Sequence, residues 1–199
     1  GEKACEDKAM PYIIRMYDDL DSNDIWVADN HTFDVMTRYN DIEKVHRIYV
    51  TTYLDVKSRK FVGWYVTNTP SSDANLFALK KGIEKYGIPK VIYCDNGREF
   101  LVRDIGGRGV RKSSKDQPAA ATILDRLGIK MVNAKVRDAK AKIVERAYKQ
   151  VKEEFSRCFD SYTGGNIIER PERLKEVIKD PSKLLKDGEF SEFFDTYIE

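Results

Sequence analysis

Three acidic side chains occupy positions where a carboxylate is costly unless it is paired or binds a ligand. Asp29 lies inside a strand-like segment, Asp95 ends a second such segment, and Glu145 lies on a long amphipathic helix. A charge in these places needs an opposite charge, hydrogen bonds or a metal ion, and the carboxyl end of a strand borders the ligand crevice in open α/β sheets. Each acid is therefore a candidate metal ligand. Taken singly, each is also explained by a hydrogen-bonded surface position, and Asn96-Gly97 after Asp95 is typical of a turn.

The helix that carries Glu145 has an apolar side and a charged side. At 100° per residue, the apolar side holds Val144, Ala147, Tyr148, Val151 and Phe155. Glu145 lies on the charged side together with Lys142, Lys149 and Lys152. Two interpretations fit this pattern: an ordinary surface helix with Glu–Lys pairs, or a metal-binding carboxylate with cations beside it that hold phosphates.

Basic residues are concentrated in one part of the chain. Residues 98–152 contain 15 Lys and Arg against 6 Asp and Glu, whereas the other residues contain 20 against 27. The formal net charge of +2 hides this asymmetry, which indicates a basic surface for a polyanion on an otherwise acidic molecule. A solvated helix face is the alternative explanation.

The elements that would position the three acids alternate between strands and helices. The expected strands span residues 25–35, 47–55, 60–68, 90–94 and 129–132. The expected helices span residues 71–86, 119–127 and 138–159, with two more helical patterns around 172–179 and 191–197. A short polar turn at 56–59 predicts a hairpin between the second and third strands. An opening run of strands followed by alternating helices and strands predicts an α/β domain with a mixed sheet.

Composition excludes several classes of protein. The longest apolar runs fall far short of the ~20 residues that cross a bilayer, so we expect no membrane partner. Cys5, Cys94 and Cys158 are odd in number and widely separated, which argues against a disulfide framework or a cysteine-based zinc site and fits a reducing, cytoplasmic compartment. Without an initiator Met, the chain is expected to be an excised fragment. Cys94 is expected to be a buried small hydrophobe, and Trp26 and Trp64 core residues.

Several motifs in the right order resemble the catalytic core of DDE transposases and retroviral-type integrases. They are WVAD at Trp26–Asp29, DNGREF at Asp95–Phe100 and KIVER at Lys142–Arg146. The segment LDVKSRKFVGW at residues 54–64 and YGIP at 86–89 are also similar to that family. The resemblance covers about residues 25–158. It divides the chain into an N-terminal arm or linker (1–24), a catalytic core (25–159) and a helical C-terminal extension (160–199).

The resemblance implies an RNase H-like fold, with a mixed five-stranded sheet flanked by helices. Asp29, Asp95 and Glu145 would together hold two Mg²⁺ or Mn²⁺ ions, a ligand set that suits these hard cations. Two such ions serve in-line phosphoryl displacement. Water would first cut the DNA and free a 3′-OH, which would then attack target DNA at the same site.

The resemblance also implies DNA partners, namely element ends and target DNA, and a multimer of the chain in the active complex. Lys149 and Lys152 would contact phosphates near the metal ions, and Lys142 and Arg146 would extend the same surface. A basic, glycine-rich loop at residues 101–118 is expected to be mobile and contains five cations: Arg103, Arg108, Arg111, Lys112 and Lys115. The last four would order over bound DNA, or the loop would be merely solubilising. His31 is expected to be structural.

The spacing of the acids refines the family assignment. Asp29 and Asp95 are 66 positions apart, and Asp95 and Glu145 are 50 apart. The second separation is longer than in retroviral integrases and looks more like phage Mu-type transposases and related bacterial elements, which predicts a prokaryotic or phage origin. Two alternatives remain: a nuclease of the same fold that cuts without joining, and a non-catalytic DNA-binding or assembly module.

Overall fold

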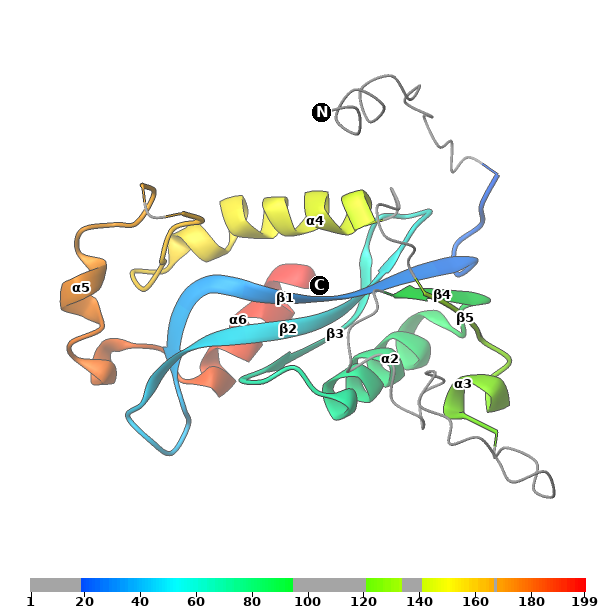
Figure 1. Cartoon of the computed structure of the whole chain (residues 1–199), viewed down its shortest axis with the longest axis horizontal. Coiled ribbons are helices and arrows are strands. Elements are labelled where there is room, and N and C mark those ends of the chain that lie inside the picture. Colours follow the sequence, from blue (N-terminus) through cyan, green and yellow to red (C-terminus); the bar gives the residue numbers. More distant parts are fainter. Residues whose placement is uncertain (1–18, 95–120, 134–140, 167) are drawn as a thin grey trace, which may run out of the picture.

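The computed structural model describes residues 19–94, 121–133, 141–166 and 168–199, and Figure 1 follows the chain through them. The strands are β1 (Ile25–Arg38), β2 (Val45–Asp55), β3 (Phe61–Thr67), β4 (Val91–Cys94) and β5 (Lys130–Asn133). The α-helices are α2 (Ser72–Tyr86), α3 (Ile123–Arg126), α4 (Ala141–Glu154), α5 (Leu174–Val177) and α6 (Asp187–Ile198). Two short 3₁₀ helices are η1 (Ser156–Cys158) and η2 (Pro181–Lys183).

The strands form one mixed sheet in the order β3-β2-β1-β4-β5. β1, β2 and β3 pair antiparallel, as the predicted hairpin requires, whereas β4 pairs parallel with β1 and β5 pairs parallel with β4. The expected mixed five-stranded sheet is therefore confirmed. Its central strand is β1, which has an antiparallel neighbour on one side and a parallel neighbour on the other.

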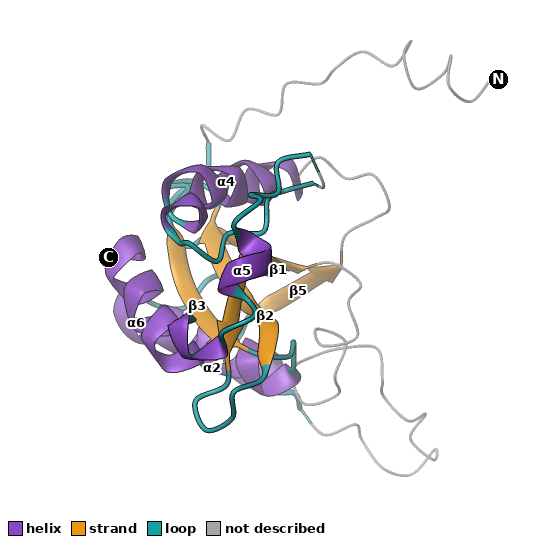
Figure 2. Ribbon diagram, turned by 90° about the vertical axis from the view of Figure 1, so that its left-hand side faces the viewer, coloured by secondary structure: helices purple, strands orange, loops and turns teal. Residues whose placement is uncertain are grey.

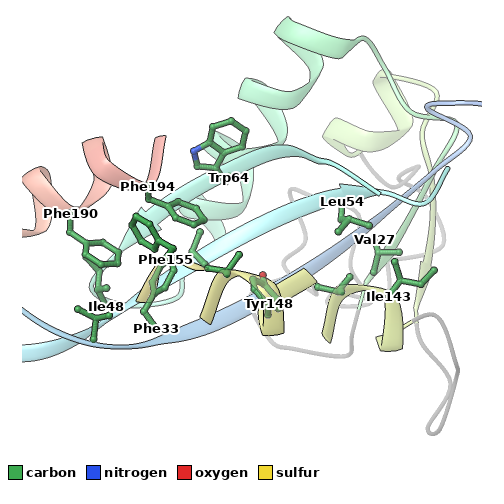
Figure 3. Close-up of a cluster of buried hydrophobic side chains, with 14 of the residues drawn as sticks. Val27, Phe33, Ile48, Leu54, Trp64, Ile143, Tyr148, Phe155, Phe190 and Phe194 are labelled. Atoms are coloured by element: carbon green, nitrogen blue, oxygen red, sulfur yellow. The ribbon is translucent and has the colours of Figure 1, made fainter. Parts of the chain in front are cut away.

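Helices cover both faces of this sheet, with α4 and α2 on opposite sides (Figure 2). Side chains of β1 alternate between the faces, as strand geometry requires. Val27 and Phe33 join the core beneath α4 and α6, which is drawn in Figure 3. Trp26 and Ala28 join the core that packs against α2 and α3. Trp26 and Trp64 are buried, as expected for core residues.

Four helices differ from their predicted bounds. The patterns expected around 172–179 and 191–197 form the shorter α5 (Leu174–Val177) and the longer α6 (Asp187–Ile198). The helix expected at 119–127 begins only at Ile123, because Thr122 is its N-cap and forms a capping box with Asp125. The long helix expected to reach residue 159 ends at Glu154 and continues as η1. In contrast, α2 agrees with the helix expected at 71–86: Ser71 is its N-cap, and Gly87, whose φ of 92° suits glycine, is its C-cap.

The last helix, α6, is part of the main core. Phe190 and Phe194 are fully buried in the cluster that also contains Phe33 and Phe155. Their rings meet Phe33 edge-on, with centroids 4.9 and 5.0 Å away, a geometry that aromatic pairs favour. None of the helices in the described segments has both the length and the apolar character that a membrane span requires.

Candidate functional site

Asp29 is positioned by the central strand at the point where β1 meets β4. The parallel register pairs Val27 with Tyr93 and Ala28 with Cys94. Asp29 is the next residue of β1, is half-buried, and accepts a hydrogen bond through Oδ1 from the Asn30 amide at 2.9 Å. By the alternation of the strand it shares the α4 face of the sheet with Val27. Its carboxylate therefore belongs to the same side of the sheet as the helix that carries Glu145.

Several predicted site residues lie outside the described part of the chain. Asp95 directly follows Cys94 in the sequence but is not itself described. The same holds for the basic loop at 101–118, including Arg108, Arg111 and Lys112. Lys142 lies in the first turn of α4, but its side chain is not described. These assignments stay predictions.

Helix α4 is attached to β1 at Asp29 by the hydroxyl group of Tyr148. This hydroxyl donates a hydrogen bond to the main-chain oxygen of Asp29 at 3.3 Å and shares a second one with Thr52 Oγ1. Thr52 is the cross-strand partner of Asp29 on β2. Glu145 precedes Tyr148 by three residues and is exposed on α4. The contact therefore holds the part of α4 that contains Glu145 against the part of β1 that contains Asp29.

Burial keeps the Tyr148 hydroxyl protonated. Burial raises the pKa of Tyr148 well above its usual value, and the nearby negative charge of Asp29 raises it further. The hydrogen bond with Thr52 lowers this pKa but is the smallest of the three effects. The group therefore remains a hydrogen-bond donor.

The charges on α4 divide the helix into two halves. In the second half, Lys152 pairs with Glu169 at 3.0 Å, and Glu154 accepts hydrogen bonds from Gln150 and Tyr197. In the first half, Glu145 is exposed and forms no ion pair with any described residue. Arg146 and Lys149, beside Glu145 and at the middle of the helix, are likewise exposed and form no ion pair within the described segments. The described residues thus supply no ion-pair partner for Glu145, Arg146 or Lys149.

Lys152 forms an ion pair within the chain, whereas the resemblance implies that it contacts DNA. Its ammonium group contacts the Glu169 carboxylate, and the Gly165 amide donates to the same carboxylate at 3.2 Å. The hydrogen bond with Glu169 raises the pKa of Lys152, and the same bond lowers the pKa of Glu169. A DNA phosphate would have to replace Glu169, so the role predicted for Lys152 needs an exchange of partners.

His31 behaves as a structural side chain. Its ring stacks on Tyr148 with centroids 4.1 Å apart and an interplanar angle of 14°, and it meets Phe33 edge-on. Burial lowers the pKa of His31 to about 4, so the ring is neutral near pH 7. A neutral stacked imidazole supports the packing of α4 on β1.

The sequence of the chain matches a known family. A model of the integrase core domain matches residues 20–139, which is more than half of the chain. The chain belongs to the integrase core domain family. The matched segment contains Asp29 and Asp95 and ends before Glu145. The mixed sheet flanked by helices is accordingly the RNase H-like fold of integrase catalytic cores. No curated protein sequence matches.

Among solved structures, this integrase core domain is similar to retroviral proteins. The HTLV-2 integrase catalytic core domain in complex with magnesium, in its dimeric form, is 16% identical, with 80% of this chain and 86% of that chain covered and a TM-score of 0.49. The trimeric form is 17% identical, with 80% and 82% covered and a TM-score of 0.46. A chain of the simian T-cell lymphotropic virus intasome, in complex with PP2A regulatory subunit B56 gamma, is 19% identical, with 87% and 48% covered and a TM-score of 0.46.

The residues present suit a divalent cation. No group of three His, Cys, Asp or Glu side chains that could hold a metal ion occurs among the described residues, of which Asp95 is not one. The two described acids nevertheless supply carboxylate oxygens, the ligands that Mg²⁺ and Mn²⁺ prefer. The exposed carboxylate of Glu145, which no described cation neutralises, fits such a role.

Reasoning from the sequence missed two contacts at this site. The helical periodicity places Tyr148 on the apolar face of its helix and accounts for its ring, but not for its hydroxyl group. A buried tyrosine usually finds a hydrogen-bond partner, so a tyrosine among apolar residues was a usable signal. The ion pair between Lys152 and Glu169 joins residues 17 positions apart, and no local sequence pattern predicts it.

Proposed function

We propose that this integrase core domain is a metal-dependent DNA strand transferase in which Asp29, Asp95 and Glu145 hold two Mg²⁺ or Mn²⁺ ions. The observation that carries the proposal is the parallel pairing of Ala28 with Cys94. Asp29 and Asp95 are the residues that follow this pair in the sequence. Adjacent parallel strands that continued in register would bring the two carboxylates to neighbouring positions.

The contact between α4 and β1 supports Glu145 as the third acid. Tyr148 bonds the main chain of Asp29, and Glu145 lies one turn earlier on the same helix. Arg146 and Lys149 lie nearby and form no ion pair with a described residue, so their charges are available to DNA phosphates.

The proposed reaction has two phosphoryl transfers. In the first, a water oxygen bonds to phosphorus, the bond from phosphorus to the 3′ oxygen breaks, and a 3′-OH is released. In the second, that 3′-OH bonds to a phosphorus of target DNA and displaces another 3′ oxygen. When bound, two divalent ions activate the attacking oxygen and stabilise the leaving one. The three carboxylates would hold these ions, and the cations on α4 would orient the phosphate backbone.

The test compares single substitutions of the three acids with a matched control. Asp29→Asn, Asp95→Asn and Glu145→Gln should each abolish both nicking and joining of DNA with pre-cut 3′-OH ends, in Mg²⁺ or Mn²⁺, while leaving the unfolding transition cooperative. Glu153→Gln, an exposed glutamate on the same helix, should leave both activities intact. Joining that survives in any of the three variants would refute the assignment.

The same assay separates the alternatives. Nicking without joining would indicate a nuclease, and neither activity together with normal DNA binding would indicate a DNA-binding or assembly module. The 50 positions between Asp95 and Glu145 favour a phage Mu-type transposase of prokaryotic or phage origin within the family. We also propose that the active form is a multimer on element ends and target DNA; the similar solved structures include a dimeric form, a trimeric form and an intasome.

A further inference from the structure

We infer that Tyr148 is a positioning residue, which sets the height and rotation of α4 on β1 and thereby the separation between the Asp29 and Glu145 carboxylates. The inference rests on the proposed function. It assigns no contact with substrate to Tyr148 itself, whose hydroxyl group is buried.

The hydroxyl of Tyr148 contacts both strands at the level of Asp29. It donates to the Asp29 main-chain oxygen, so the shared bond with Thr52 Oγ1 must run from the threonine hydroxyl to the tyrosine oxygen. Thr52 is fully buried and lies opposite Asp29 in the β1–β2 register. One side chain of α4 therefore holds both members of a cross-strand pair.

The ring of Tyr148 is held from two sides as well. It stacks on His31, two residues after Asp29 on the same face of β1, and it packs against Phe61 of β3 at a centroid distance of 5.6 Å. Only 5% of Tyr148 is exposed. Because buried aromatic rings pack tightly, the ring limits sliding of the helix along the strand and the hydroxyl limits its rotation.

Glu145 follows any movement at Tyr148. A three-residue separation corresponds to about 4.5 Å along a helix and about 60° around it, so the two side chains leave the same short stretch of backbone in different directions. Tyr148 is buried against the sheet, whereas Glu145 is exposed at the side of the helix. A small roll of α4 would change the distance between the two acids, and Mg²⁺ tolerates little deviation from octahedral geometry.

The fold supplies a matched control on the other face of the sheet. Tyr53 is also buried, with 1% of its surface exposed, and its hydroxyl donates to Asn75 Oδ1 at 3.2 Å. Tyr53 packs with the α2 side of the core, away from α4. Tyr53→Phe therefore removes a buried hydroxyl and its hydrogen bond without touching the contact between α4 and β1.

The experiment compares Tyr148→Phe with Tyr53→Phe in the whole chain. Both should lower Tm to a similar extent. Only Tyr148→Phe should lower kcat for DNA joining, by ~10-fold or more, with KM for DNA changed less than twofold, because displacement by about 1 Å costs up to ~100-fold in rate. Only Tyr148→Phe should also raise the Mn²⁺ concentration that gives half of the thermal stabilisation measured without DNA.

The outcomes distinguish this inference from the proposed function. An active wild-type protein whose Tyr148→Phe variant retains kcat and Mn²⁺ response would overturn the positioning role alone. Equal losses in the Tyr53→Phe variant would do the same, because they would reflect general destabilisation. A wild-type protein that neither responds to Mn²⁺ nor processes DNA would overturn the proposed function, and the positioning role with it.

Discussion

Replacing Phe194 with alanine should test whether α6 is required for the stability of the sheet. Phe194 is fully buried, and its ring meets Phe33 at 5.0 Å and Phe155 at 5.4 Å. Removal of a buried phenylalanine side chain costs about 3–5 kcal/mol through lost burial and the cavity that remains. Domains have ~5–15 kcal/mol of stability in total, so this change should remove a large share of it.

The expected shift can be measured by thermal and urea unfolding. For a chain of this size each kcal/mol lowers Tm by about 2–4 °C, so Phe194→Ala should lower Tm by roughly 6–20 °C. The control is Phe193→Ala at the adjacent position of α6, a residue that is 53% exposed. This control should change the free energy of unfolding by less than ~0.5 kcal/mol. A small effect of Phe194→Ala, or equal effects of the two variants, would refute the view that α6 completes the core.

Two further predictions concern electrostatics. Glu169→Gln should tighten DNA binding ~twofold to fivefold at low salt, because Lys152 would lose its intramolecular ion-pair partner. The gain in affinity should vanish in a Lys152→Ala background and be absent in the control Glu172→Gln. A gain that persists without Lys152 would contradict this explanation. His31 has a pKa of about 4 in the folded chain and ~6.5 when unfolded, so its contribution to stability is complete above pH 6.5 and is lost as the pH falls towards 4. Urea unfolding with a chelator should therefore show a loss of about 2 kcal/mol between pH 7 and 4.5 that His31→Gln abolishes; an unchanged pH dependence in that variant would show that other groups cause the loss.

The local signals in the sequence were sufficient for most of the framework. Ser71 and Gly87 mark the ends of α2 because a cap and a left-handed turn are properties of a few neighbouring residues. The hairpin between β2 and β3 follows in the same way from a short polar turn. The inner face of α4 follows largely from periodicity: Val144, Tyr148, Val151 and Phe155 are buried as predicted, Ala147 is half-buried, and Ile143 is buried in addition.

Contacts between distant parts of the chain were not predictable in this way. The bond from Tyr148 to the Asp29 main chain joins residues 119 positions apart and depends on how the helix crosses the strand. The same is true of Trp64 and Lys81, which both donate hydrogen bonds to Asp195 on α6. Such contacts follow from the packing of whole elements, which periodicity and spacing do not determine.

Phe155, which lies directly after α4, connects that helix to α6 within the core. Its ring contacts Phe190, Phe194 and Tyr197 of α6, and its backbone amide continues the hydrogen bonding of α4. Energetic coupling between two sites is reciprocal. A ligand that immobilises α4 near Glu145 should therefore make α6 harder to detach. By the same coupling, a truncation that removes α6 should weaken ligand binding, although Glu145 and Phe155 are separated by about 15 Å of helix at ~1.5 Å per residue.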